Sequence, residues 1–192
     1  MCQLLGMNAN VPTDICFSFT GFRARGGLTD HHRDGWGIAF FEGKGARVFL
    51  DPAQSAQSPV AELVKHYPIR SLNVIAHNRK ATQGEVRLEN THPCQRELWG
   101  RYWIFAHNGN LNGFAPRLSG RFLPVGTTDS ELAFCRILDH LAQRFPQGTQ
   151  DIGELHGALR EMAREIGARG EFNFLLSDGD KLFAHSSSRL CY

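Results

Sequence analysis

The sequence lacks any apolar run long enough to cross a bilayer, and its start lacks the positive stretch and apolar core of a secretory signal. These absences predict a cytoplasmic protein with no membrane contact. The net charge is only +2, so the composition requires no acidic partner. The densest basic segment, residues 23–33, is broken up by Gly and Asp, which disfavours nucleic acid as a partner.

Paired cysteines are also missing. The five cysteines are odd in number, scattered, and include no CxxC pair, which argues against a disulfide framework and against a zinc ribbon. Most of them should be small buried hydrophobic residues. Only Cys2 stands at a position that suggests chemistry. The five are Cys2, Cys16, Cys94, Cys135 and Cys191.

The apolar pattern predicts one α+β domain over residues 1–192, long enough to bury a substantial core. Ser58-Pro59 has the chemistry of a helix start, and Thr128 with Glu131 forms a capping box. The last residues, 186–192, look like strand and carry no polar tail, which suggests a chain truncated at its C-terminus. The expected strands are 2–8, 36–41, 46–50, 72–77, 102–107, 172–176 and 182–185, and the expected helices begin near residues 58, 128 and 152.

Cys2 becomes a candidate nucleophile if Met1 is removed, which a small second residue generally permits. A free Cys thiol has a pKa of about 8.5, so a base must take its proton before it can attack. The newly exposed α-amine of Cys2, with a reference pKa of about 7.7–8.0, can do so directly or through a water. Position alone does not separate this role from that of a small hydrophobic residue.

Three further segments supply what amide hydrolysis by a thiolate needs. The side-chain amide of Asn108 and the backbone N–H of Gly109 could form a two-donor oxyanion hole at the end of a strand. Arg79 presents a planar fork that suits a carboxylate, and Thr82 can add a hydroxyl. Asp129 lies in the first turn of a helix, where a carboxylate is favoured and can face an ammonium group. Each segment alone is a weak signal.

Taken in order, these segments resemble the glutamine amidotransferase type 2 family of N-terminal nucleophile hydrolases, and most closely its stand-alone members without a synthase domain. The resemblance covers most of the chain. The matching segments are Met1-Cys2, HRDGWGIAFF at residues 32–41, RKATQG at 79–84, NTHP at 90–93, HNG at 107–109 and TDSE at 128–131.

The resemblance implies a four-layer αββα sandwich of two mainly antiparallel sheets, with Cys2 at the start of a central strand. It implies that Cys2 cleaves the γ-carboxamide of glutamine through a γ-glutamyl thioester. Arg79 would then hold the substrate α-carboxylate and Asp129 the α-ammonium, while Asn108 and Gly109 would form the oxyanion hole. Thr82 and the backbone near residue 83 would line the pocket. The family often has an aromatic residue and a His where this chain has Lys80 and Gln83.

Two other interpretations were weighed. His77, His92 and His107 recur at equal spacing and could bind zinc, but no further ligand set accompanies them. We therefore expect neither a metal nor another cofactor. A catalytically silent glutamine-binding or γ-glutamyl-binding subunit of a larger complex is the second alternative. Retention of the whole set of candidate residues argues against it.

Within the enzyme class, two hypotheses stay open. The chain either feeds ammonia to an acceptor or synthase subunit, or it hydrolyses a γ-glutamyl small molecule unaided. It contains no P-loop and no strand-linked GxGxxG motif, so it shows no site for an activated acceptor. This slightly favours a γ-glutamyl amidohydrolase that acts alone.

Overall fold

The computed structural model describes residues 2–188. Its elements, in chain order, are β1 (Gln3–Thr13), α1 (Cys16–Arg25), β2 (Trp36–Glu42), β3 (Gly45–Asp51), α2 (Pro59–His66), β4 (Ser71–Asn78), the 3-10 helix η1 (Leu88–Asn90), β5 (Cys94–Leu98), β6 (Arg101–Leu111), α3 (Asp129–Arg144), α4 (Ile152–Gly167), β7 (Gly170–Ser177) and β8 (Leu182–His185).

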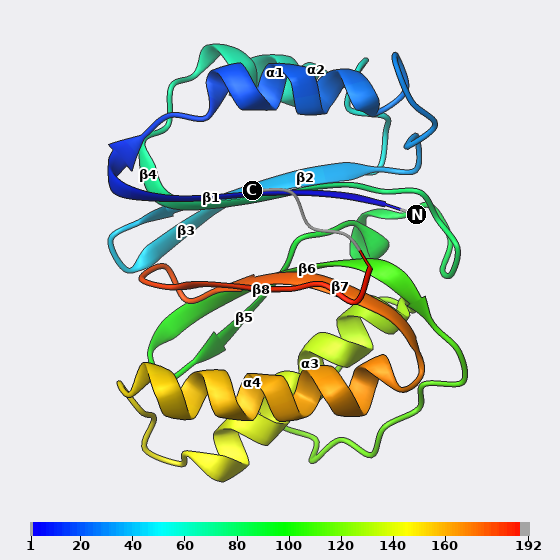
Figure 1. Ribbon diagram of the computed structural model, residues 1–192. Coiled ribbons are helices and arrows are strands. Elements are labelled where there is room, and N and C mark those ends of the chain that lie inside the picture. Colours follow the sequence, from blue (N-terminus) through cyan, green and yellow to red (C-terminus); the bar gives the residue numbers. More distant parts are fainter. Residues whose placement is uncertain (1, 189–192) are drawn as a thin grey trace.

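The elements form four layers (Figure 1). One sheet has the strand order β1-β4-β2-β3 and the other β5-β6-β7-β8, and neighbouring strands in both are antiparallel. Helices α1 and α2 cover the outer face of the first sheet, and α3 and α4 cover the outer face of the second. The α+β class and the αββα sandwich are therefore confirmed. Cys2 does not precede a central strand, however, because β1 lies at the edge of its sheet. No helix within residues 2–188 is both long and apolar enough to span a bilayer.

Local sequence explains several element boundaries. Strands β2 and β3 form a hairpin, as the polar, Gly-rich turn between the two expected strands predicts, and the turn contains Gly43 at a φ of 57° that favours glycine. At the start of α2, the Ser58 hydroxyl accepts a hydrogen bond from the Ala61 N–H. Thr128 does the same for the Glu131 N–H at the start of α3. The return half of that capping box is absent, because Glu131 accepts from Gly126 and Arg96 instead.

Other expectations need correction. The strand expected at 102–107 continues to Leu111, because its last residues pair with the start of β7. The HNG segment therefore lies inside β6 and does not follow it. The apolar pattern of the helix near residue 152 predicts that Ile152 lies on its buried face, but Ile152 is 58% exposed. Helix α1 and strand β5 were not expected. Residues 186–188 are not strand, and 189–192 lie outside the described residues.

Three apolar clusters hold the layers together, and the middle one positions the site. Between the sheets, Ile75 of β4 packs among apolar side chains that include Ile104 and Ala106 of β6. Side chains two residues apart on a strand share a face, so His77 follows Ile75 into the space between the sheets. The apolar layer thus gives way to polar residues at the end of β4. The outer clusters pack under α1 and α2 and under α3 and α4.

Candidate active site

A small cavity lies where the polar end of this middle layer meets the start of β1 and the N-terminus of α3. Its volume is about 20 Å³, close to that of a single water site. The structure brings Cys2, Arg79, Thr82, Gly109 and Asp129 together there. Asn108 is not among the lining residues, although it lies between two of them in β6. The lining is formed by Cys2, His77, Arg79, Lys80, Thr82, Gln83, His92, His107, Gly109, Thr128, Asp129 and Ser130.

The Cys2 thiol is held by the main chain of the loop that follows β4. Its Sγ lies 3.4 Å from both the N–H and the carbonyl oxygen of Lys80. Burial raises the pKa of the thiol above its ordinary value, and the Asp129 carboxylate adds to this. The Lys80 hydrogen bond and the positive charge of Arg79 oppose the shift but do not cancel it. The thiol is therefore protonated at neutral pH, and a base must act before it can attack.

Arg79 is buried, and its guanidinium group is engaged by main-chain carbonyls. Nη2 donates to the carbonyls of Gln83 at 2.8 Å and Gly84 at 3.0 Å. Nη1 donates to those of Glu85 at 3.1 Å and Asp34 at 3.4 Å. Arg79 thus shapes the loop beside the cavity. A substrate carboxylate would have to share this guanidinium with the loop.

The side-chain oxygens of Asp129 are held in place by two main-chain amides. One oxygen accepts from the Leu111 N–H at 2.8 Å, and the other accepts from the Ser130 N–H at 2.9 Å. Position in the first turn of α3 adds the favourable end of the helix dipole. The group is 9% exposed and lines the cavity.

Gly109 occupies a position in β6 that has no room for a side chain. A Cβ there would lie 1.8 Å from the carbonyl oxygen of Glu171 and 2.6 Å from Nε2 of His107. Asn108, on the opposite face of the strand, has a buried Oδ1 without a hydrogen-bond partner among the described residues. Its main-chain carbonyl accepts from the Asn173 side chain at 3.0 Å. The main chain of Asn108 is thus tied to β7, whereas its side-chain oxygen is left without a partner among the described residues.

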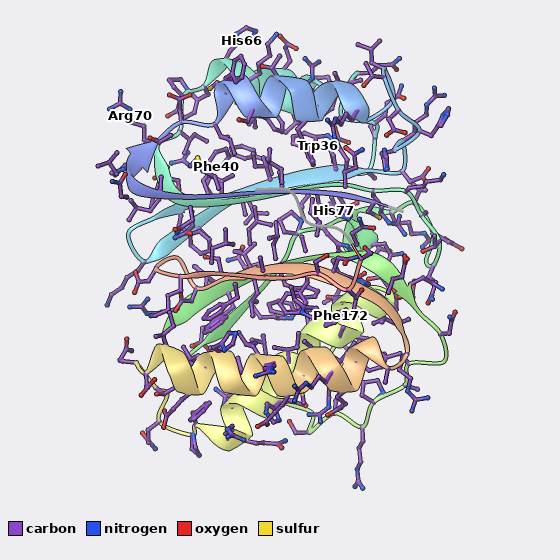
Figure 2. The ribbon with its side chains drawn as sticks, in the orientation of Figure 1. Trp36, Phe40, His66, Arg70, His77 and Phe172 are labelled. Carbon is purple, nitrogen blue, oxygen red and sulfur yellow. The ribbon has the colours of Figure 1, made fainter. Side chains whose placement is uncertain are left out.

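Three histidines surround the cavity, and His77 is visible between the two sheets in Figure 2. Burial is the main cause of a lowered pKa in each, and for His92 the pKa falls to about 3. His92 Nε2 lies 3.1 Å from the Thr128 hydroxyl, and the His77 and His92 rings are 5.3 Å apart. All three are neutral at pH 7. The structure therefore brings the three equally spaced histidines together at one cavity.

No group of three or more His, Cys, Asp or Glu side chains within residues 2–188 is arranged to hold a metal ion. Two of the three histidines instead face hydroxyl groups at the start of α3, His92 facing Thr128 and His107 facing Ser130. The zinc alternative has no support from this geometry.

The loop after β4 is tied down on both sides of the cavity. Thr82 is exposed at the cavity edge. Gln83 reaches across to β6, where its Nε2 donates to Oδ1 of Asn110 at 2.6 Å. Asp34 accepts from the Ala81 N–H at 2.8 Å. Sequence reasoning quoted the HRDGWG segment but gave Asp34 no role, because its partner is a main-chain amide 47 residues away.

The comparisons with known proteins agree on one family. The family model described as class-II glutamine amidotransferases matches residues 1–192. The Escherichia coli (strain K12) protein named "Putative glutamine amidotransferase YafJ" is 55% identical over 190 residues, which are 99% of this chain and 74% of that protein. A Haemophilus influenzae protein named "Putative glutamine amidotransferase" is 54% identical over 193 residues, 100% of this chain and 65% of that protein.

Solved structures show the same architecture. The crystal structure of a predicted glutamine amidotransferase from Pseudomonas aeruginosa is 45% identical, covers 97% of this chain and 73% of that one, and has a TM-score of 0.75. The glutamine phosphoribosylpyrophosphate amidotransferase of B. subtilis is 17% identical and covers 97% of this chain and 37% of that one, with a TM-score of 0.62. At 17% identity, the likeness to the B. subtilis enzyme shows only that the fold is shared.

Proposed function

Because this chain belongs to the class-II glutamine amidotransferase family, we propose that its Cys2 thiolate cleaves the γ-carboxamide of glutamine or of a related γ-glutamyl amide. One observation carries the proposal. The Cys2 thiol shares a cavity with a buried guanidinium, a carboxylate held by two amides, and a glycine that leaves its own backbone accessible. A zwitterionic amino acid with an amide at its far end is complementary to such a set.

The proposed reaction begins after Met1 is removed. The free α-amine of Cys2 accepts the thiol proton, directly or through a water. The thiolate attacks the amide carbon, and the resulting tetrahedral intermediate expels ammonia or an amine as the C–N bond breaks, with the proton passing from the Cys2 ammonium to the leaving nitrogen. Water then hydrolyses the γ-glutamyl thioester, which releases glutamate or its analogue and restores the thiol.

The other cavity residues have proposed roles in binding and stabilisation. Arg79 holds the α-carboxylate and Asp129 the α-ammonium group of the substrate. The side-chain N–H of Asn108 and the main-chain N–H of Gly109 donate to the oxyanion, which is the charge that develops only during the reaction. Thr82 lies at the edge of the cavity, where it can contact the bound substrate.

The function stays open in one respect, which is the identity of the substrate and of any acceptor for the nitrogen that it releases. We propose that the substrate is glutamine or another γ-glutamyl small molecule in the cytoplasm, and that any acceptor is supplied by another domain or subunit. The curated relatives named above are longer, since this chain spans 74% and 65% of them. Hydrolysis without a partner is the slightly favoured form, because the chain shows no acceptor motif.

The test is chemical labelling combined with ammonia release. Intact-mass analysis should show a chain without Met1, and an electrophilic glutamine analogue should add once, at Cys2. Cys2→Ala should abolish both the labelling and the release of ammonia from glutamine. Cys16→Ala is the matched control, since it removes a thiol outside the cavity and should leave both signals intact.

Two results would contradict the proposal. Active protein that retains Met1 would exclude the N-terminal amine as the base. A Cys2 that binds γ-glutamyl compounds but releases no amine from any of them would indicate a silent binding subunit. A panel of γ-glutamyl amides assayed without partners separates the unaided hydrolase from an ammonia donor.

A further inference from the structure

His107 is a buried side chain whose ring orientation can be assigned from its two hydrogen bonds. Nε2 lies 3.2 Å from the main-chain carbonyl of Glu171, which can only accept. Nε2 therefore carries the proton, and the lone pair of the neutral ring is on Nδ1. Nδ1 lies 2.8 Å from the Ser130 hydroxyl, which must then be the donor.

Both ends of this chain of hydrogen bonds meet candidate site residues. Ser130 follows Asp129, and its own N–H donates to the Asp129 carboxylate at 2.9 Å. At the other end, Nε2 of His107 and the carbonyl of Glu171 both lie against Gly109, at 2.6 and 1.8 Å from where a Cβ would be. The hydrogen bonds thus connect the start of α3 to the strand segment that presents the Gly109 backbone.

We propose that Ser130 and His107 are positioning residues, which fix the Gly109 peptide relative to Asp129 so that the oxyanion donor and the ammonium clamp are set by one rigid unit. The inference rests on the proposed amidohydrolase function. Neither side chain reacts. Each acts by holding a main-chain group in place, with Ser130 donating to His107 and His107 donating to Glu171 beside Gly109.

The kinetic signature of positioning is a selective loss of kcat. Ser130→Ala leaves both main-chain amides on Asp129, so the KM for glutamine should change by less than about twofold. The buried Nδ1 loses its donor and the Gly109 peptide loses its support, so kcat should fall about tenfold, in the range expected for an unmade buried hydrogen bond. Ser130→Thr keeps the hydroxyl and should restore kcat. Asp129→Asn should instead raise KM.

A double-mutant comparison tests whether the two residues act in series. His107→Gln retains an amide N–H that can reach Glu171 but offers no acceptor at the Nδ1 position. Once that acceptor is gone, removing the Ser130 hydroxyl should cost nothing more, so the double variant should match His107→Gln. Ser177→Ala serves as the control, because it removes a buried hydroxyl that accepts from Gly179 outside the cavity. It should leave kcat unchanged.

A readout independent of activity separates this inference from the proposed function. The ¹⁵N shifts of the His107 ring should show a protonated Nε2 and a bare Nδ1 whose shift moves in Ser130→Ala. A protonated Nδ1, an unchanged kcat in Ser130→Ala, or additive losses in the double variant would overturn the inference. A wild-type protein with the assigned tautomer but no amide hydrolysis would instead refute the proposed function and, with it, the catalytic purpose of this positioning.

Discussion

At Gly109, the packing of two strands leaves space for a hydrogen atom only. We expect Gly109→Ala to abolish ammonia release, because its methyl group must displace the Glu171 carbonyl or the His107 ring. Gly157→Ala is the matched control, since no atom lies within 4 Å of its Cβ position in α4. That substitution should raise the free energy of unfolding by about 0.5–1 kcal/mol, through the better helix propensity of alanine.

Activity assays and urea denaturation of both variants check this prediction. If Gly109→Ala kept full activity, the backbone of β6 would not be the oxyanion donor. A destabilised Gly157→Ala would mean that this position of α4 is constrained by something other than its own backbone.

The sequence was sufficient to predict most of the residues that line the site, but not the groups that surround each of them in the fold. Five of the six candidate residues line one cavity. Ser130 had no signal of its own, because its role depends on His107, 23 residues away. Arg79 was expected to hold the substrate α-carboxylate. Its hydrogen bonds to loop carbonyls follow from a tertiary arrangement that no spacing rule encodes.

Helix α1 shows how one element is fixed by few contacts. Phe19 is 1% exposed and packs against Trp36 at 5.7 Å between ring centroids, whereas Phe17 on the same helix is 94% exposed. Phe19→Ala should therefore lower the free energy of unfolding by about 3–5 kcal/mol. Phe17→Ala should change it by less than about 0.5 kcal/mol. Urea midpoints of the two variants measure the difference, and similar losses in both would mean that Phe17 is covered in solution.

Elements with strong local signals could be predicted, and those that depend on tertiary pairing could not. Strand β8 and the start of α2 agree with the expected bounds, because a short apolar run after a polar, Gly-containing turn and a Ser-Pro start are local signals. Helix α1 buries only Phe19 and Phe22, too few for an apolar period. Strand β5 is mostly polar and is defined by its pairing with β6. The extension of β6 likewise requires β7.

For the molecule as a whole, the family resemblance is confirmed by the match over residues 1–192 and by the four layers. The two sheets meet through a small apolar cluster in the middle and through the buried histidines at one end. This end carries the polar groups of the candidate site. The three histidines there are held neutral, since burial lowers the pKa of His77, His92 and His107.

That neutrality predicts an acid-sensitive fold. The pKa of His92 is about 3 in the folded state against 6.5 ordinarily, so between these values the unfolded chain binds a proton that the folded chain does not. The free energy of unfolding must then fall as pH falls, by up to about 1.4 kcal/mol per pH unit for each such histidine. The slope is measured from urea midpoints between pH 6.5 and 5.0, a range in which most carboxylates stay ionised. His92→Gln should flatten the slope, whereas Gln at the exposed His156 should not. An unchanged slope in His92→Gln would mean that this ring is protonated within the folded protein, and the neutral wall of the cavity would have to be abandoned.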